Sequence, residues 1–290
     1  MTHLDARSRR PEFLPLGTTP RPTTGPDLAA RLREALRVSA GGGVQGIDRA
    51  RIDAVLEGAG VKSVDIDLTG VVVGTDHSAA GAAPSKPAVR RRDEARLHRL
   101  RLDAHPLMAV DLPVDVTVEV EGLQFAWIEG TDHRLGAELL EPSHADPLSG
   151  HARVAVDKAG VAGTAQGLLA ATLSSQGVQL VSFDLDVRQQ GPRGASLSID
   201  AKVRKGFLSA SATATASASI DEHMVLTIGD IRISSGNPII NALLATVRGR
   251  IEAAAQQRID LAATLPPGVR LADVRLDVGQ QIVISARLAG

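Results

Sequence analysis

Segments in which apolar and polar residues strictly alternate restrict this chain to a fold built largely on β-strands. In 114–121, four valines alternate with Asp, Thr and Glu residues, the period-2 pattern of a strand with one wet and one dry face. Residues 61–73 repeat this pattern. In 209–219, alanines alternate with serines or threonines, so one face of that strand carries only methyl groups. The dry faces of such strands must be covered by other elements.

The remaining elements follow from apolar spacing and from helix start signals. Helical spacing predicts helices at 28–36, 47–58 and 157–177, the last with Asp157 as its N-cap. Asn237-Pro238 is a favoured helix start, and the apolar stripe that follows predicts an amphipathic helix there. Further strands are predicted at 151–156, 178–189, 195–204, 207–219, 223–234 and 281–286.

A nine-residue phrase that begins with Gly-Val occurs three times, at 60–68, 177–185 and 268–276. Each copy is expected to follow a helix, which the glycine ends, and to form a long strand. A helix of about 24 residues from Asn237 spans roughly 36 Å, and a strand of about 13 residues spans roughly 43 Å. These matched lengths favour helices lying along long antiparallel strands. Chance similarity among valine-rich strands is the alternative.

The domain organisation follows from the same pattern. Residues 1–25, rich in arginine and proline, predict a flexible tail without the apolar core of a signal peptide, and 75–88 predict a loop. Residues 26–290 are expected to form a single domain with repeated halves at about 47–149 and 150–290. A membrane-spanning helix is not expected, because the chain has no run of 18 or more apolar residues.

Composition excludes several classes of function. The chain has no cysteine, so disulfides, thiol nucleophiles and thiolate metal sites are excluded. One Trp, four Phe and a formal charge of −1 do not supply the stacking platforms and basic groove that nucleic-acid binding needs. The apolar content is therefore mostly aliphatic and small.

The sequence also lacks the usual signatures of an enzyme. No GxSxG, Walker loop, HExxH or strand-borne GxGxxG is present. The eight histidines are scattered, so no metal and no cofactor is expected. Asp65/Asp67 and Asp184/Asp186 are spaced for paired acid and base work on one strand face, but the wet face of a strand is the simpler interpretation. We expect no catalytic residues.

Charge is distributed unevenly along the chain. Arginines crowd the segment 90–101, whereas 111–146 holds nine carboxylates and only Arg134. Such asymmetry can steer a charged ligand, although solvated strand faces and loops are the simpler interpretation because salt screens such charges. The sequence makes four arginines candidates for contact with lipid head groups or a membrane surface: Arg90, Arg91, Arg92 and Arg96.

Covering the methyl-only strand with the helix from Asn237 leaves two outcomes open. Short alanine side chains leave room for an apolar slot that takes an alkyl chain, or bulky Leu and Ile side chains fill the space. The predicted lipid-lining residues are Leu168, Leu169, Leu173, Ala210, Ala212, Ala214, Ala216, Ile240, Leu243, Leu244, Val247 and Ile251.

The C-terminal half resembles the LmeA-like family of mostly actinobacterial phospholipid-binding proteins of the tubular lipid-binding (TULIP) type. The most specific part is LPPGVRLADVRLD at 265–277, followed by a short apolar strand. The match is good over about 151–290 and looser over 48–130. The resemblance implies an α+β fold in which a strongly bent antiparallel sheet wraps around long amphipathic helices and encloses an elongated apolar cavity for acyl chains. No catalytic residues carry over from the family.

The leading hypothesis is therefore non-enzymatic binding or transfer of phospholipid or another acyl lipid, with peripheral membrane contact. The alternative is a structural module with a dry-packed core that docks a basic protein partner. A hydrolase acting on lipids is a third reading, against which the absence of a nucleophile motif counts. Lacking a signal or spanning helix, the sequence indicates the cytoplasm or the inner membrane surface, whereas the family resemblance indicates the cell envelope.

Overall fold

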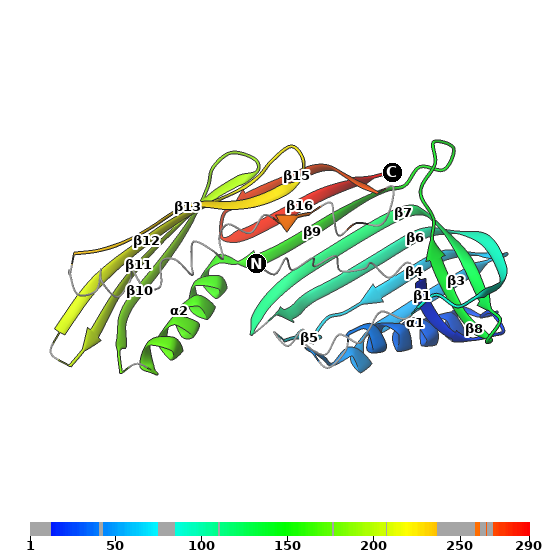
Figure 1. Cartoon of the computed structure of the whole chain (residues 1–290), viewed down its shortest axis with the longest axis horizontal. Coiled ribbons are helices and arrows are strands. Elements are labelled where there is room, and N and C mark those ends of the chain that lie inside the picture. Colours follow the sequence, from blue (N-terminus) through cyan, green and yellow to red (C-terminus); the bar gives the residue numbers. More distant parts are fainter. Residues whose placement is uncertain are drawn as a thin grey trace, which may run out of the picture.

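The computed structural model describes residues 13–40, 43–74, 85–109, 111–175, 177–206, 208–236, 259–261, 265 and 269–290. In this part of the chain the fold is α+β, mostly strands with two α-helices, as expected. The strands form an 11-stranded sheet and a five-stranded sheet that follow one another along the long axis of the molecule (Figure 1).

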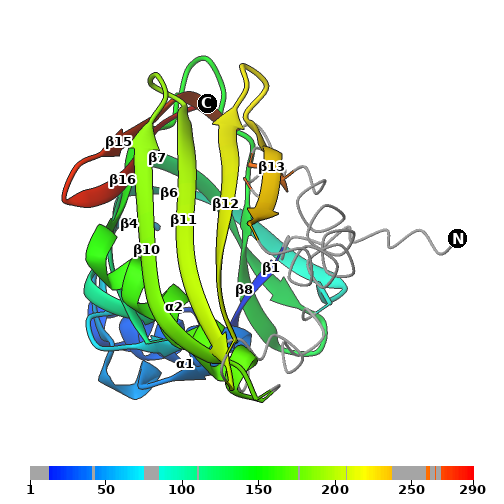
Figure 2. The same cartoon turned by 90° about the vertical axis from the view of Figure 1, so that its left-hand side faces the viewer.

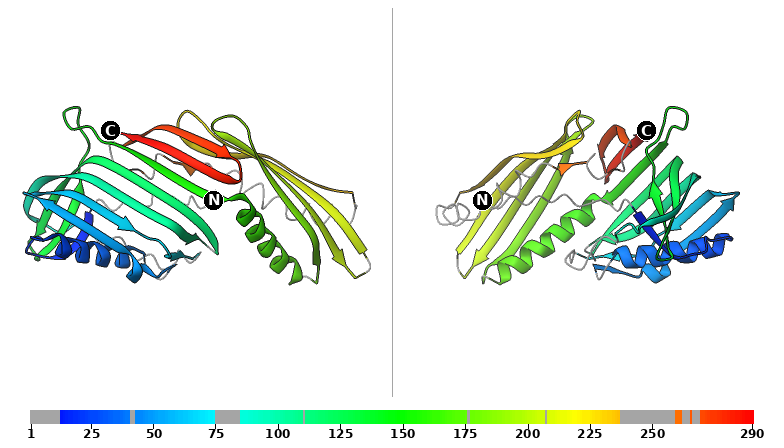
Figure 3. Two further views of the ribbon diagram at one scale, coloured as in Figure 1. Left: turned by 180° about the vertical axis from the view of Figure 1, so that it is seen from behind. Right: turned by 45° about the vertical axis from the view of Figure 1, so that its right-hand side comes forward.

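The large sheet is mixed, so the purely antiparallel sheet predicted from the sequence is wrong in this respect. Its main order is β15 (Arg270–Val278), β16 (Gln281–Ala289), β9 (Ser149–Asp157), β7 (Leu112–Gly130), β6 (Val89–Ala109), β4 (Gly60–Asp67) and β3 (Arg51–Glu57). β4 runs parallel to β6, whereas the other neighbours in this order are antiparallel. Neither sheet is strongly curled (Figure 3).

Four short strands complete the large sheet at its sides. β2 (Val44–Gln45) pairs with β5 (Val72–Val73), which runs parallel to β6. β8 (Arg134–Leu139) pairs with β7 and, on its other side, with β1 (Phe13–Thr18). Phe13 and Leu16 are buried. This part of the predicted flexible tail is therefore a strand of the fold.

The main core lies where α1 (Gly25–Ala40) packs on β3 and β4. Leu28 and Ala29 of the helix meet Ile52 and Val64 of the strands. The helix predicted at 28–36 is thus confirmed, but the helix predicted at 47–58 is wrong. That segment holds a short 3-10 turn and then β3, because Gly58, in the left-handed region at φ 58°, turns the chain into a hairpin with β4.

The small sheet confirms the predicted run of four strands. Its order is β10 (Gln179–Gln189), β11 (Gly194–Lys205), β12 (Leu208–Ile220), β13 (Val225–Ser235) and the two-residue β14 (Ile259–Asp260), all antiparallel. α2 (Lys158–Ser174) links β9 to β10 and packs along β10. Asp157 caps it as predicted, since its side chain accepts a hydrogen bond from the backbone N–H of Gly160 at 2.9 Å.

The two sheets meet where the β10–β11 turn docks on β15, the edge strand of the large sheet. The backbone N–H of Leu276 donates to Pro192 O at 2.8 Å, and the side chain of Gln189 donates to Leu276 O at 2.9 Å. Arg193 Nε donates to Val274 O at 3.2 Å. These bonds satisfy backbone groups that an edge strand otherwise leaves open.

The connectivity departs from the predicted pair of repeated halves. β9, β15 and β16 come from the second half of the chain but join the sheet built by the first half. Of the three Gly-Val phrases, the copy at Gly177 follows a helix, whereas the copy at Gly60 follows β3. The predicted helix from Asn237, with Ile240, Leu243, Leu244, Val247 and Ile251, lies outside the described residues. Within the described residues, no helix is both long and apolar enough to span a bilayer.

Candidate functional site

The face of the large sheet that carries α1 is apolar across its whole width, and we call it the inner face. Directly paired residues share a face of a sheet, so the apolar set can be followed from strand to strand. Ile66 of β4 packs against the α1 core and pairs with Leu102, which pairs with Val118. The next row, two residues further along the strands, is Ala104, Val116, Val154, Ile284 and Leu276.

Part of this inner face, on β9 and β16, is exposed among the described residues. Val154 is 38% exposed and Ile284 is 43% exposed. Both helices lie on the same side of the large sheet, with α1 under β3 and α2 near the ends of β7 and β9 (Figures 1 and 3). The two exposed side chains lie on β9 and β16, beyond the strands that α1 covers. A strip of apolar surface therefore remains between the helices.

The small sheet also has one apolar face, and the predicted alanines lie on it. Ala210, Ala212, Ala214 and Ala216 of β12 pair with Val203, Ala201, Ile199 and Leu197 of β11, and all eight are half-buried. These pair in turn with Leu180, Phe183, Leu185 and Val187 of β10. α2 lies behind β10, on the side of the small sheet that faces the large sheet (Figure 2).

The residues predicted on α2 are less enclosed than a cavity lining requires. Leu168 is 61% exposed, and Leu169 and Leu173 are half-buried. No residue of α2 is buried. The structure therefore places the alanines of β12 and the leucines of α2 in the same part of the molecule, the small sheet with its helix. Among the described residues, these side chains do not enclose a cavity.

A hollow of about 550 Å³ lies over the opposite, polar face of the small sheet. Its lining includes hydroxyls such as Ser198 and Thr215 and two arginines, Arg188 and Arg232. It also includes four carboxylates, Asp184, Asp186, Asp200 and Asp230. Asp184 lies directly opposite Asp200, an unfavourable like-charge pair. Asp186 is held instead by Lys158 at 2.7 Å and Arg188 at 2.6 Å, and these hydrogen bonds lower the pKa of Asp186. The hollow suits a polar or basic ligand rather than an alkyl chain.

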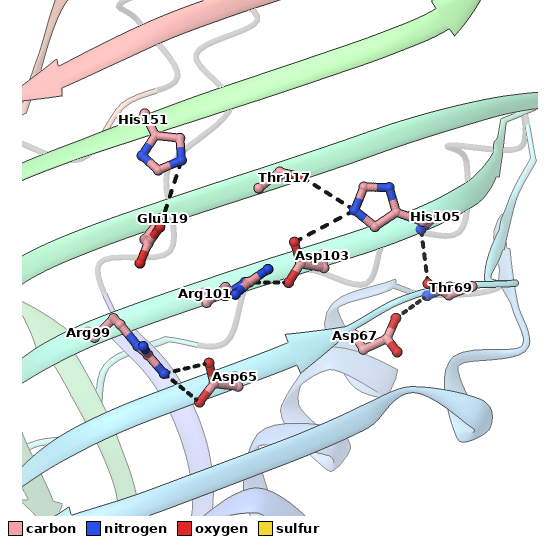
Figure 4. Close-up of polar contacts among 10 residues, drawn as sticks. All are labelled: Asp65, Asp67, Thr69, Arg99, Arg101, Asp103, His105, Thr117, Glu119 and His151. Atoms are coloured by element: carbon pink, nitrogen blue, oxygen red, sulfur yellow. Dashed lines mark hydrogen bonds and ion pairs between the residues drawn. The ribbon is translucent and has the colours of Figure 1, made fainter.

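The outer face of the large sheet balances its own charges. Arg99 bonds to Asp65 at 3.2 Å, Arg101 to Asp103 at 2.6 Å, and hydrogen bonds from Thr69 lower the pKa of Asp67 (Figure 4). One row of directly paired residues crosses six strands with acidic and basic side chains: Asp65, Arg101, Glu119, His151, Arg287 and Asp273. This pairing confirms the wet strand faces expected from the sequence.

One constellation on this face has the atom order of a hydrolytic triad. Thr117 Oγ1 lies 3.4 Å from His105 Nε2 (Figure 4). His105 Nδ1 lies 3.5 Å from Asp115 Oδ1. Acyl transfer also needs donors for the developing oxyanion and a pocket that excludes water. Here His105 is exposed, Asp115 and Thr117 are half-buried, and the β6–β7 pairing is irregular between Ala104 and Leu107. The backbone N–H of His105 donates to Thr69 Oγ1 at 2.9 Å, so it is not free to bind an oxyanion. The geometry therefore favours a solvated charge network over catalysis. Among the described residues, no group of three or more His, Asp or Glu is placed to hold a metal ion.

The four arginines proposed for head groups are all paired with carboxylates. Arg90 bonds to Glu129 at 3.0 Å, Arg91 to Asp93 at 2.8 Å, Arg92 to Glu138 at 3.4 Å and Arg96 to Asp146 at 2.9 Å. The basic segment and the acidic block are brought together because β6 and β7 form one long hairpin, with β8 beside it. A phosphate would have to compete with these carboxylates.

Sequence reasoning missed the inner face of the large sheet as a binding surface. The alternation of valines was visible, but which strands pair, and which part of their dry face the helices leave uncovered, depends on topology. The pairing of β9 with β16 brings Val154 beside Ile284 from a distance of 130 residues. Comparison with family models, with curated proteins and with solved structures found no match to this chain. The resemblance to the LmeA-like family stays a prediction.

Proposed function

We propose that this protein binds phospholipid or another acyl-chain lipid, without catalysis, on the apolar inner side of its two sheets, and that it holds or transfers such lipids. The observation that carries the proposal is the exposed pair Val154 and Ile284 on the inner face, whose apolar row neighbours Val116 and Leu276 are half-buried in the part of the chain that the structure describes. A contiguous exposed apolar surface on a soluble fold usually marks a binding site. Aliphatic walls of valine, isoleucine and alanine suit an alkyl chain, which needs no stacking partner.

The finer architecture belongs to the same proposal. We infer a tubular lipid-binding arrangement in which the inner faces of both sheets and the two helices together surround the acyl chains. Three features support it: both sheets have one apolar face, both helices lie on one side, and the β10–β11 turn joins the sheets end to end. The charge-balanced outer face of the large sheet leaves the inner side as the surface for an apolar ligand.

The test is extraction of the purified protein followed by lipid mass spectrometry, with uptake of a fluorescent phospholipid by the stripped protein as a second readout. We expect a co-purified acyl lipid or saturable uptake. A protein that emerges free of lipid and also fails to take up the fluorescent phospholipid contradicts the proposal.

The hollow on the polar face of the small sheet favours a second candidate function, docking of a basic protein partner. Asp184 and Asp200 have no ion-pair partner among the described residues, so a lysine or arginine from outside would relieve their repulsion. The discriminating variant is Asp184→Asn with Asp200→Asn. If the protein binds lipid on its inner face, this double variant should take up lipid as well as the wild type does. Docking of a basic protein is favoured if the wild type binds no lipid and the double variant no longer retains a basic partner in pull-downs.

A further inference from the structure

A long uncharged segment forms one end of the small sheet. Residues 159–183 contain no Asp, Glu, Lys or Arg, although 22% of the chain is charged. They make up nearly all of α2 and the first part of β10. A helix without a charged side is normally buried, yet no residue of α2 is buried and Leu168 is 61% exposed. Val181, at the start of β10, is 50% exposed.

The strand register places the later part of this segment, from the C-terminal end of α2 into β10, at the end of the small sheet that points away from the large sheet. Gln179 pairs with Arg204, and Lys205 pairs with Leu208 in the next hairpin, whereas the opposite end carries the turn that docks on β15. We define the free end as residues 168–175, 178–183, 201–206 and 208–212. It forms one extremity of the molecule along its long axis (Figures 1 and 3).

Basic residues accompany the apolar ones at the free end. Lys202 and Arg204 are exposed, Lys205 follows them, and none of the residues that define the free end is acidic. Arg204 donates to the uncharged amide of Gln179 at 2.6 Å, and Lys202 has no ion-pair partner among the described residues. Within the part of the chain that the structure describes, these charges are therefore not balanced by carboxylates, unlike those of Arg90 to Arg96. The acidic residues of the small sheet begin at Asp184 and Asp200 and continue toward the large sheet.

We propose that the free end docks peripherally on an anionic lipid bilayer. Exposed apolar side chains enter the boundary between head groups and acyl chains. Lysine and arginine side chains on the polar face of the small sheet, at the same end, contact the anionic head groups. Leu168 and Val181 supply the apolar contact, and Lys202 and Arg204 supply the charge. This surface lies outside the inner-face row centred on Val154 and Ile284, so docking goes beyond the proposed lipid binding and does not require it.

The first experiment measures binding to vesicles of phosphatidylcholine with and without phosphatidylglycerol, by co-sedimentation at low salt. Each basic residue near such a surface contributes about 1 kcal/mol, so Lys202→Gln with Arg204→Gln should weaken binding to the anionic vesicles about 30-fold. The matched control, Lys62→Gln with Arg153→Gln, makes the same charge change at exposed positions of the large sheet and should leave binding within about threefold of the wild type. Equal loss in both pairs indicates non-specific attraction and overturns the proposal.

A third pair, Arg91→Gln with Arg92→Gln, tests the other candidate contact. Because both arginines are already paired with carboxylates, we expect little change in vesicle binding. If this pair loses binding while the Lys202 and Arg204 pair retains it, the contact lies on β6 and the proposal is wrong. Thermal unfolding of each variant confirms that it is folded.

The second experiment locates the inserted residue. The chain has no cysteine, so Leu168→Cys and Val38→Cys each carry a single environment-sensitive fluorophore. Val38, 51% exposed on α1, is the control on the helix that packs on the large sheet. We expect anionic vesicles to shift the emission to the blue at position 168 and not at 38. Vesicle binding with no shift at 168 overturns the proposal, as does failure of the wild type to bind. A change of oligomeric state in Leu168→Gln with unchanged vesicle binding identifies a second copy as the occupant instead.

Lipid uptake distinguishes this proposal from the proposed function. A protein that binds anionic vesicles through the free end but takes up no fluorescent phospholipid supports docking alone. A protein that takes up phospholipid but does not bind vesicles supports the inner-face site alone and contradicts docking.

Discussion

Val154 on β9 and Ile284 on β16 lie directly opposite each other on the inner face of the large sheet, and both remain substantially exposed. Their row neighbours on either side, Val116 and Leu276, are apolar as well. In a sheet with one dry face, such a central pair is normally covered by a helix or a second sheet. Its exposure here is the feature that the account of lipid binding explains.

The open pair should be tolerant of polar substitution. We expect Val154→Asn and Ile284→Asn each to lower the free energy of unfolding by about 1 kcal/mol, because neither side chain is fully removed from water. Val274→Asn on β15, where the side chain is only 2% exposed, should cost about 3 kcal/mol. Urea unfolding followed through the fluorescence of Trp127 measures both. A large loss in either inner-face variant would show that the row is part of a closed core.

The carboxylate of Glu129 anchors the N-terminal segment to the large sheet. It is 8% exposed and forms ion pairs with Arg21 at 3.3 Å and with Arg90 at 3.0 Å. Removal of one partner of a buried pair leaves charge without compensation. Arg21 keeps an ion pair with Asp93, and Arg90 is half exposed. Glu129→Ala should therefore destabilise the protein by about 1–2 kcal/mol, with a change in the fluorescence of Trp127, whose ring lies 6.0 Å from the guanidinium of Arg21. The exposed Glu94→Ala is the control, and equal effects would contradict the anchoring role.

Glycines inside α2 weaken that helix without serving its packing. A Cβ added at Gly163 or Gly167 meets no other heavy atom within 4 Å. Each change to alanine should stabilise the protein by about 1 kcal/mol or less, since alanine restricts the unfolded chain and favours the helix. Gly136→Ala should do the reverse, because its Cβ would overlap the ring of Phe13 and Leu14 O. The midpoint of thermal unfolding shows whether each variant is more or less stable than the wild type. A lower midpoint for Gly163→Ala would mean that other residues pack closely against α2 at this position, which would contradict the account.

The link between α2 and β10 should be sensitive to acid. Hydrogen bonds from Lys158 and Arg188 lower the pKa of Asp186 in the folded protein. A lowered folded pKa contributes stability above the unfolded value of about 4, and this contribution is lost as the pH falls through the folded value. The midpoint of thermal unfolding should therefore differ between wild type and Asp186→Asn at pH 6, and the difference should shrink toward pH 3. A constant difference across this range contradicts the assignment.

Local patterns predicted much of this fold. Alternation located the strands of the small sheet, and Asp157 marked the start of α2 because capping is decided within one turn. The segment 47–58 was predicted to be helical because Ile52, Val55 and Leu56 fit helical spacing. The stretch is too short to distinguish the helical period of 3.6 residues from the strand period of two. Pairing with β4 makes this segment a strand, because Ile52 then lies opposite Ile66 and is buried against α1.

The candidate site was less predictable than the fold. The methyl-only face of β12 was visible in the sequence, but its openness depends on what α2 covers. The role suggested for Arg90 to Arg96 rested on charge alone, and the pairing of β6 with β7 and the position of β8 supply the carboxylates that balance it. The row through Val154 and Ile284 exists only because the C-terminal hairpin returns to β9, a long-range pairing that no local pattern specifies.

Uptake of a fluorescent phospholipid by the wild type and by Val154→Asn with Ile284→Asn tests the central claim most directly. Val55→Asn with Val89→Asn, at positions of similar exposure on β3 and β6, is the matched control. The account predicts saturable uptake by the wild type and the control, and at least about tenfold weaker uptake by the inner-face variant, since two apolar contacts are lost. Equal uptake by all three proteins, or none by the wild type, would contradict it.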